Sequence, residues 1–351
     1  MKAKAVIGAN WGDEGKGLTV DWLCSRGDAG VVVRFNGGSQ AAHTVVAPDG
    51  RRHVFRQVGS GAFSGVPTFL SRFSLVNPIA LLLELRQLGE LGVEPEIYAS
   101  PECLVTTFAD MILNRRIENE RPGGRHGSCG MGIGETVDRS NVPELKITLS
   151  DLYNHSASLE TKLAEICDRY ARFRTGRPIA DVPMMDSFLK ACELLPNLVF
   201  PAGIGQCVDP VFEGAQGLCL DSENREFFPH VTRSRTGLHN VRILCREAGI
   251  DDLQAWYVTR TYLTKHGAGP LPGEDPRLSY EDDTNEESVY QGKMRFAPLD
   301  VRDLRERIRR DAGDAAVRLM ATHRDQLDLG ELESDASSWG PCRSDVREEL
   351  K

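Results

Sequence analysis

The sequence predicts an α/β protein built on a mainly parallel β-sheet with helices on both faces. Apolar, β-branched runs end at glycines, and stretches with helical periodicity lie between them. The first unit is a strand at 4–8, a glycine-rich turn, a helix from about 17 to 24 and a strand at 31–35. Because ligands bind at the carboxyl ends of the strands in such sheets, we expect function in the loops that follow them.

The later elements continue this alternation. Helices are expected at 81–91, 159–173, 185–194 and 302–310, and strands at 94–99, 198–200, 210–212, 254–261 and 317–321, followed by a short polar tail. The helix at 302–310 is so rich in charge that we expect it to face solvent. Residues 272–292 are acidic and poor in apolar side chains, which is typical of a mobile surface loop. No repeat or low-complexity linker divides the chain, so we expect one domain over residues 1–351.

Composition narrows the class of protein. The 351 residues are 40% hydrophobic, which suffices for a large core, and 51 acidic against 42 basic residues give a net charge of −9. This balance argues against binding to nucleic acid or an anionic membrane. The nine cysteines form no CxxC pair, so we expect reduced thiols rather than a zinc site or disulfides. No run reaches about 18 apolar residues, and we expect a soluble, cytoplasmic protein.

A glycine-rich segment between the first strand and the first helix is the strongest local signal. Its residues are Gly12, Asp13, Glu14, Gly15, Lys16 and Gly17. Glycines allow close backbone approach, N–H groups at a helix start favour phosphate oxygens, and Lys16 adds a positive charge. The segment is not a Walker A loop, since Asn10 stands at its first glycine and Gly17 at its Ser/Thr position. Carboxylates here repel phosphate unless they bind a metal ion or take a proton, so Asp13 and Glu14 indicate chemistry.

Further glycine-bearing loops combine backbone access with polar side chains. They lie at 34–44, which contains His43, and at 128–134, 212–217 and 264–270. In order, the segments GDEGKG, RFNGGSQAAHTVV, GMGIGE, FEGAQG, FPHVT and HGAGPLP closely resemble the adenylosuccinate synthetase family. The resemblance runs from residue 5 to about 295 and resumes at 321–325 and 339–343. It implies a parallel-sheet α/β fold of the P-loop type and a homodimer.

The resemblance also implies a reaction. Family members transfer the γ-phosphoryl group of a nucleoside triphosphate to the 6-oxo group of a purine nucleotide, and the amine of aspartate then displaces phosphate at C6. Asp13 would take the N1 proton and bind Mg²⁺ together with the carbonyl of Ala42. His43 would lie against the phosphoryl group and supply a proton or positive charge.

The binding residues are carried over in the same way. The donor nucleotide is expected at Gly12, Asp13, Glu14, Gly15, Lys16, Gly17, His43, Thr44, Arg295, Asp325, Gly340 and Pro341. The acceptor nucleotide is expected at Asp13, Ser39, Gln40, Ser128, Cys129, Arg139, Gln216 and Thr232. Aspartate is expected at Gln291, Gly292, Lys293 and Arg295. Arg139 is the candidate that reaches the acceptor phosphate across the dimer interface.

Departures from the family pattern bear on the substrate. Gln40 replaces an asparagine beside the acceptor base. Lys293 stands where TTGRRRR places an arginine that reaches the ribose 2′-hydroxyl as well as aspartate. In a chain with 33 Arg and 9 Lys this lysine runs against the composition, and losing the contact favours a 2′-deoxynucleotide. Residues 322–325 lack the lysine of the guanine-reading TKLD, which weakens the case for GTP as donor.

These departures, and a shorter C-terminal region, resemble the bacteriophage branch of the family. Its members join L-aspartate to dGMP with ATP or dATP and give N6-succino-2-amino-2′-deoxyadenylate, a precursor of 2-aminoadenine in phage DNA, in the cytoplasm of the infected host. The alternative is a conventional synthetase that uses IMP and GTP, which the retained Asp13 favours, since some phage members replace this aspartate. A regulator without catalysis is a third reading, against which Asp13, Lys16 and His43 together speak.

Overall fold

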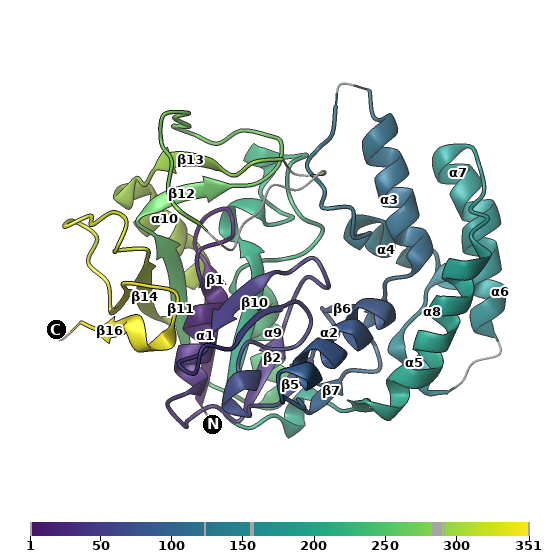
Figure 1. Cartoon of the computed structure of the whole chain (residues 1–351), viewed down its shortest axis with the longest axis horizontal. Helices are drawn as coiled ribbons and strands as arrows, with labels where there is room; N and C mark the ends of the chain where they lie inside the picture. Colours follow the sequence, from purple (N-terminus) through teal and green to yellow (C-terminus); the bar gives the residue numbers. More distant parts are fainter. Residues whose placement is uncertain (1, 123, 155–157, 283–289, 291, 350–351) are drawn as a thin grey trace.

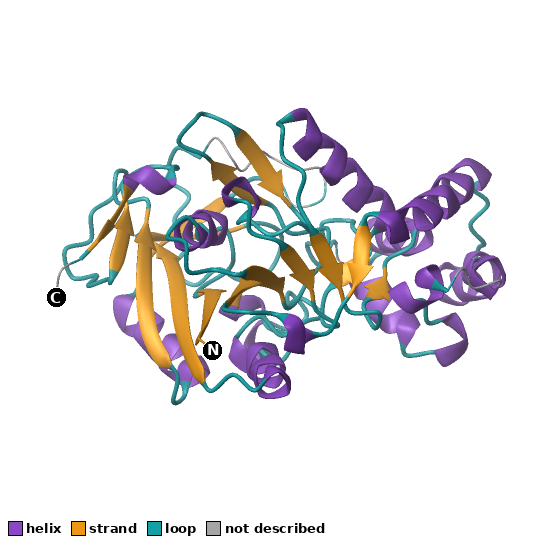
Figure 2. Ribbon diagram, turned by 90° about the horizontal axis from the view of Figure 1, so that it is seen from below, coloured by secondary structure: helices purple, strands orange, loops and turns teal. Residues whose placement is uncertain are grey.

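The computed structural model describes residues 2–122, 124–154, 158–282, 290 and 292–349. In this part of the chain a ten-stranded sheet runs through the molecule in the order β16-β15-β14-β11-β1-β10-β2-β5-β7-β9 (Figures 1 and 2). Every described pair in it is parallel except β15–β16. The predicted fold class, a mainly parallel sheet with helices on both faces, is confirmed.

The strands of the large sheet are β1 (Lys2–Gly8), β2 (Val31–Arg34), β5 (Thr68–Leu70), β7 (Ile97–Ala99), β9 (Val199–Pro201), β10 (Pro210–Gly217), β11 (Asp252–Arg260), β14 (Ala316–Thr322), β15 (Ala336–Ser338) and β16 (Val346–Glu348). Three small sheets pair β3 (His43–Val46) with β4 (Arg52–Phe55), β6 (Leu75–Val76) with β8 (Leu104–Val105), and β12 (Tyr262–Lys265) with β13 (Arg295–Pro298). The helices of five or more residues are α1 (Lys16–Cys24), α2 (Pro78–Glu90), α3 (Phe108–Glu120), α4 (Ile133–Ser140), α5 (Leu149–Tyr153), α6 (Ser158–Glu165), the π-helical Ile166–Tyr170, α7 (Ala171–Thr175), α8 (Val182–Leu194), α9 (Leu238–Ala248) and α10 (Val301–Ala312).

Alternate side chains of the central strands pack in two different cores. Ala5 and Ile7 of β1 lie in a cluster with apolar residues of α9 and α10, whereas Val6 lies in a cluster with residues of α1. Strands covered on both faces read as continuous apolar runs, which is why β1 and β2 were visible in the sequence. A third cluster joins α2, α3 and α8, and the helices α3–α8 form a lobe beside the sheet (Figure 1).

Most predicted elements are confirmed, with three corrections. Strand β10 continues to Gly217, so the 212–217 motif is strand rather than loop. The strand at 317–321 is not the last, because β15 and β16 follow it. Helix α10 forms as predicted and exposes most of its charged side chains, but Arg307 on this helix is partly buried and contacts the loop after β1, which was not predicted.

The remaining predictions concern the cysteines, membrane-spanning helices, the loop at 272–292 and the number of domains. All nine cysteines are described, and all are free thiols. Among the described residues no helix is long and apolar enough to cross a membrane. The expected mobile loop at 272–292 falls partly on residues 283–289 and 291, outside the described part, and the single domain stays a prediction.

The topology places the predicted motifs together. Strand β1 lies between β10 and β11 at the middle of the sheet, and β2 lies beyond β10. The loops after parallel neighbours leave the same edge of a sheet, so the turns after β1, β2 and β10 are adjacent. This edge holds the candidate site.

Candidate active site

Glu14 organises the loop between β1 and α1 from within. Its carboxylate is buried, and Oε1 accepts hydrogen bonds from the backbone N–H groups of Asn10 (3.1 Å) and Gly12 (2.8 Å). Oε2 forms an ion pair with Lys16 Nζ at 2.7 Å. Gly12 and Gly15 have φ of +100° and +96°, which favour glycine. The negative charge of Glu14 is thereby compensated inside the loop, and phosphate binding by the backbone N–H groups at the start of α1 stays a prediction.

Three side chains from other elements hold the backbone of this loop. Thr322 Oγ1 of β14 donates to the Glu14 carbonyl at 2.7 Å. Arg307 of α10 donates to the Ala9 carbonyl at 3.1 Å, and Arg260 at the end of β11 donates to the Asp13 carbonyl at 2.5 Å. None of these three supports was predicted from the sequence. Nothing in the sequence marks Arg260, and Arg307 is hidden among the exposed charges of its helix.

Asp13 is held in a left-handed backbone conformation, with φ +59°. Its carboxylate keeps 30% of its surface exposed, and Oδ2 lies 3.7 Å from Nε2 of His266, in the loop after β12. Gln216 is close to this part of the loop, since a Cβ on Gly12 would lie 3.9 Å from its Cα. The predicted residues Asp13 and Gln216 therefore lie at the same edge of the sheet. The accessible carboxylate of Asp13 lies beside the loop after β12.

His43, the first residue of β3, packs against the loop. A Cβ on Gly17 would lie 2.9 Å from the His43 Cβ, so only glycine allows this approach. Nδ1 of His43 lies 2.6 Å from Oε1 of Glu213, a fully buried carboxylate on β10. An ionised carboxylate is only an acceptor, so Nδ1 carries the proton and Nε2 is left for a ligand.

Glu213 is a charged anchor for this histidine. It also accepts hydrogen bonds from the backbone N–H and hydroxyl of Ser60, and Arg34 Nη1 lies 3.1 Å from it. Burial raises the pKa of Glu213, but the charges of Arg34 and His43 outweigh burial and lower it to about 2. Burial lowers the pKa of His43, and Glu213 opposes that shift. Glu213 lies in the predicted 212–217 motif, but no signal in the sequence assigns it this role.

Ser39 and Gln40 bring unpartnered polar atoms to the loop after β2. The Ser39 hydroxyl and both side-chain amide atoms of Gln40 are buried without a hydrogen-bond partner among the described residues. An unsatisfied buried group costs about 1–3 kcal/mol, so a polar ligand that pairs with these atoms gains affinity. This arrangement is consistent with the predicted acceptor-binding role of both residues, which stays a prediction.

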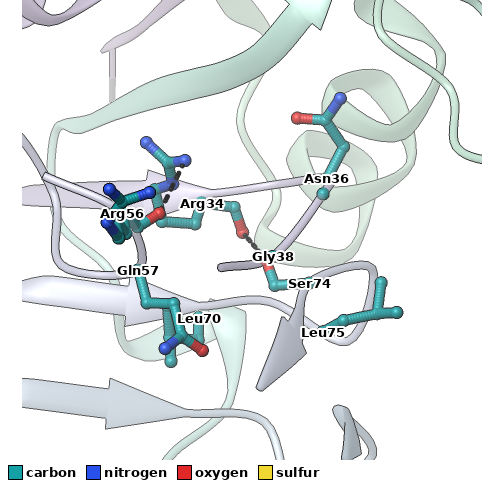
Figure 3. A pocket seen from close by; sticks show the side chains of 9 residues that line it. Arg34, Asn36, Gly38, Arg56, Gln57, Leu70, Ser74 and Leu75 are labelled. Atoms are coloured by element: carbon teal, nitrogen blue, oxygen red, sulfur yellow. Dashed lines mark hydrogen bonds between the residues drawn. The ribbon is translucent and has the colours of Figure 1, made fainter. Parts of the chain in front are cut away.

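A small cavity lies below the same loop (Figure 3). Its lining is Arg34, Asn36, Gly37, Gly38, Arg56, Gln57, Leu70, Ser74 and Leu75. Arg34 and Arg56 lie beside each other in it, and Arg34 donates to the Arg56 carbonyl at 3.2 Å. The cavity has about the size of one water molecule. It is too small to hold a nucleotide.

Three further loops meet near the predicted acceptor residues. His230 Nδ1 lies 3.0 Å from the His126 carbonyl, and a Cβ on Gly127 would lie 2.8 Å from the backbone N of Ala268. Ser128 and Cys129 follow His126 directly, and Thr232 follows His230 by two residues. Ser128 Oγ donates to Asn114 Oδ1 at 2.8 Å, and burial raises the pKa of the Cys129 thiol, which stays protonated. Ser128, Cys129 and Thr232 therefore come from two loops that touch.

Arg139 does not have its predicted role. It is fully buried, and its guanidinium forms an ion pair with the equally buried Asp110 at 2.8 Å and donates to the carbonyls of Val105 and Leu145. A side chain enclosed in this way cannot reach a phosphate in another subunit. The prediction of a cross-interface arginine at this position is wrong, and Arg139 is instead part of the core between α3 and α4.

The predicted aspartate residues are only partly described. Gln291 lies outside the described residues, Gly292 has φ +68°, and Lys293 is exposed. Arg295, on β13, donates to the carbonyls of Gly267 (3.0 Å) and Gly269 (2.8 Å) and forms an ion pair with Glu274. Arg295 thus supports the loop after β12, and its binding of aspartate or donor stays a prediction.

The predicted donor-base residues lie at the carboxyl ends of β14 and β15. Asp325 is exposed, whereas Arg324 beside it is buried and bonded to Ser337 Oγ at 2.8 Å. Gly340 is required by space, because a Cβ there would lie 2.6 Å from Asp345 Oδ2, and Pro341 is exposed. Thr44, on β3 next to His43, is partly exposed. Asp325 and Pro341 are thus exposed, and Gly340 and Thr44 are partly exposed, so their binding of the donor base stays a prediction.

The described residues contain no cluster of three or more His, Cys, Asp or Glu side chains that could hold a metal ion. Asp13 offers one partly exposed carboxylate, and Ala42, next to His43, is exposed. Mg²⁺ is usually bound by one or two carboxylates together with substrate phosphates and water. The donor set therefore fits a Mg²⁺ ion that binds with a nucleotide and does not fit a resident metal centre.

A glycine-rich loop before a helix, a buried His–Glu pair against it and an accessible carboxylate, all at the carboxyl edge of a parallel sheet, are typical of the nucleotide-dependent enzymes that transfer phosphoryl groups. Residues 5–295 match the family model of adenylosuccinate synthetase. The chain belongs to the adenylosuccinate synthetase family of carbon–nitrogen ligases.

Relatives and solved structures agree with this assignment. Adenylosuccinate synthetases of Thioalkalivibrio sulfidiphilus and Alkalilimnicola ehrlichii are 32% and 33% identical over 289 and 290 residues. Each match covers 78% of this chain and 65% of the relative, so the chain spans about two thirds of the length of these proteins. The fully ligated enzyme of Plasmodium falciparum superposes with a TM-score of 0.79 at 16% identity, covering both chains completely. The succinoaminodeoxyadenylate synthetase of cyanophage S-2L, bound to dGMP and to dATP as energy donor, gives 0.68 at 16% identity and covers 99% and 95% of the two chains.

Proposed function

We propose that this protein joins L-aspartate to C6 of dGMP. ATP or dATP supplies the phosphoryl group, and the products are N6-succino-2-amino-2′-deoxyadenylate, ADP or dADP, and phosphate. The enzyme acts as a homodimer in the cytoplasm of the cell in which it is made, on the route to 2-aminoadenine in DNA.

The proposal that the acceptor is a deoxynucleotide rests on the exposed Lys293. Conventional members of the family have an arginine here that reaches the ribose 2′-hydroxyl. An ammonium group on a flexible stem does not reproduce the planar, multiply donating guanidinium, so the preference for ribose is lost. The cyanophage neighbour, which binds dGMP and dATP, supports the same substrate class.

The side chains of the site divide the chemistry between them. Asp13 accepts the N1 proton of the base while the 6-oxo group attacks the γ-phosphorus. His43, fixed through Nδ1 by Glu213, directs Nε2 at the transferring phosphoryl group. In its imidazolium form, which the Glu213 carboxylate stabilises, it offers that group a proton or positive charge. Lys16 and the backbone N–H groups at the start of α1 bind the donor phosphates. The amine of aspartate then displaces phosphate from C6.

Asp13 and the Ala42 carbonyl are the protein groups that would hold Mg²⁺. When bound with the donor, the ion neutralises charge that develops on the phosphates. The Asp13 carboxylate would serve both this ion and the base, and its partly exposed position at the rim of the loop leaves it accessible to both.

A conventional synthetase is the second candidate, because the relatives at 30–33% identity are named adenylosuccinate synthetase. Purified protein incubated with aspartate and Mg²⁺, and with dGMP or IMP crossed with ATP, dATP or GTP, separates the two. We expect turnover of dGMP with ATP or dATP. Turnover of IMP with GTP, without turnover of dGMP, would establish the conventional activity instead.

Replacing Lys293 with Arg tests the argument about the sugar. We expect the ratio of kcat/KM for dGMP to that for GMP to fall about fivefold, because one restored hydrogen bond to a 2′-hydroxyl contributes on the order of 1 kcal/mol. Lys190 is an exposed lysine on α8, far from Lys293 in the sequence, and gives a matched Lys→Arg control. An unchanged ratio in the Lys293 variant would show that this position does not choose the sugar.

A further inference from the structure

Arg260 joins two parts of the molecule that are far apart in sequence. Its side chain is 3% exposed, at the end of β11. Nε donates to the Asp13 carbonyl at 2.5 Å, and Nη2 forms an ion pair with Asp282 Oδ2 at 2.6 Å. Asp282 ends the described part of the acidic segment, which we define as residues 272–282. One guanidinium therefore bridges the phosphate loop and the acidic segment.

The backbone of Asp13 needs such a contact. Its φ of +59° is costly for a residue with a Cβ and persists only where the surroundings hold it. Thr322 fixes the next carbonyl, that of Glu14, and Arg260 fixes that of Asp13 itself. Rotation of the peptide between them would move the carboxylate that the proposed reaction uses, so the bond from Arg260 sets the direction of the Asp13 side chain.

The other end of the bridge is also fixed. The ring of Tyr280 stacks on that of Tyr262 in β12, with centroids 3.7 Å apart and planes within 7°. The Glu281 carbonyl accepts a hydrogen bond from Gln326 Nε2 at 2.6 Å. The end of the acidic segment is thereby docked against β12 and the turn after β14, which places the Asp282 carboxylate at the guanidinium.

We propose that Arg260 is the positioning residue of Asp13, and that its ion pair with Asp282 makes the geometry of the phosphate loop depend on the docking of the acidic segment. In sequence, this segment leads to the residues predicted to bind aspartate. The inference rests on the proposed function, because it takes Asp13 as the proton acceptor. Only a planar fork such as arginine reaches both partners, so lysine cannot replace it.

Two substitutions test the bridge from its two sides. Arg260→Lys keeps the charge but loses one of the two contacts, and we expect kcat to fall about 100-fold, with the KM for acceptor and donor within about twofold of wild type. Asp282→Asn should lower kcat about tenfold, and the double variant should be no slower than Arg260→Lys alone, because both changes break one network. The thermal midpoint should remain near that of wild type in each variant.

Arg277→Gln is the matched control. It breaks the ion pair with Asp275, an exposed pair in the same acidic segment, and contacts nothing in the phosphate loop. We expect wild-type kcat and KM from it. A loss as large as that of Asp282→Asn would attribute the effect to the charge of the segment and would overturn the inference.

Hydrogen exchange of the backbone amides of residues 12–15, measured without substrates, separates the inference from the proposed function. Arg260→Lys and Asp282→Asn should speed this exchange, and Arg277→Gln should not. If wild type turned over neither dGMP nor IMP, the proposed function would fail, and the exchange would still decide whether Arg260 holds the loop. Wild-type exchange and wild-type kcat in Arg260→Lys would overturn the inference.

Discussion

Replacing His43 with Ala is expected to lower kcat by about 10³-fold or more, since a positioned acid–base group typically contributes 10²–10⁴. The imidazole lies against the phosphate loop, and its Nδ1 is 2.6 Å from a carboxylate whose pKa is lowered to about 2. That ionised partner stabilises positive charge on the ring as the phosphoryl group moves. Alanine removes the ring and leaves the loop, so binding of the donor nucleotide should remain measurable by titration calorimetry.

Two further variants make the experiment specific. Glu213→Gln keeps the size of the partner but removes its charge, and we expect a smaller loss of kcat, together with a changed pH profile. His239, an exposed histidine on α9, gives a His→Ala control that should leave turnover unchanged. Wild-type turnover in the His43 variant would refute its role in the transfer, whereas loss of donor binding would point to a structural role.

The positions of several central strands along the chain were predictable from the sequence. Buried parallel strands give short apolar runs between glycines, and this pattern identified β1, β2, β11 and β14. The β3–β4 hairpin and the two last strands were missed because each is only three or four residues long, which is too short for a clear alternation of apolar and polar residues. Their positions depend on contacts with α1 and β14, which local periodicity does not encode.

The residues of the site also divide into those that were predicted from the sequence and those that were not. Motif resemblance marked the phosphate loop, His43 and Gln216, which lie at one edge of the sheet. It did not mark Glu213, Arg260 or Arg307 as supports of that loop, because each acts through one contact with a residue far away in sequence. Such long-range supports depend on which strands are neighbours, and only the structure gives that information.

Arg139 shows where resemblance misled. The sequence offered an arginine shortly after the GMGIGE motif, and a position near the acceptor phosphate followed from that spacing alone. The structure instead places its guanidinium on Asp110, whose carboxylate also caps α3 by accepting from the backbone N–H of Thr107 at 2.8 Å. Both ion-pair partners have 0% of their surface exposed, so neither charge is available to a ligand.

Replacing Arg139 with Gln should therefore act on stability rather than on substrate binding. It leaves the Asp110 carboxylate buried without its cation, and breaking a buried pair from one side typically costs about 3–5 kcal/mol. Urea unfolding should show this loss in the free energy of unfolding, with the KM for the acceptor nucleotide near wild type at temperatures where the variant is folded.

A surface pair provides the comparison that makes this result diagnostic. Arg172 on α7 forms an i,i+4 ion pair with Asp168 in which both side chains are more than half exposed, and Arg172→Gln should cost only about 0.3–0.5 kcal/mol. Asp110→Asn combined with Arg139→Gln should recover part of the stability, because no unpaired charge is then left in the core. A stable Arg139 variant with a strongly raised acceptor KM would reinstate the cross-interface role. The expected pattern instead assigns the acceptor phosphate to other cations, since Arg139 is fully committed to its own subunit.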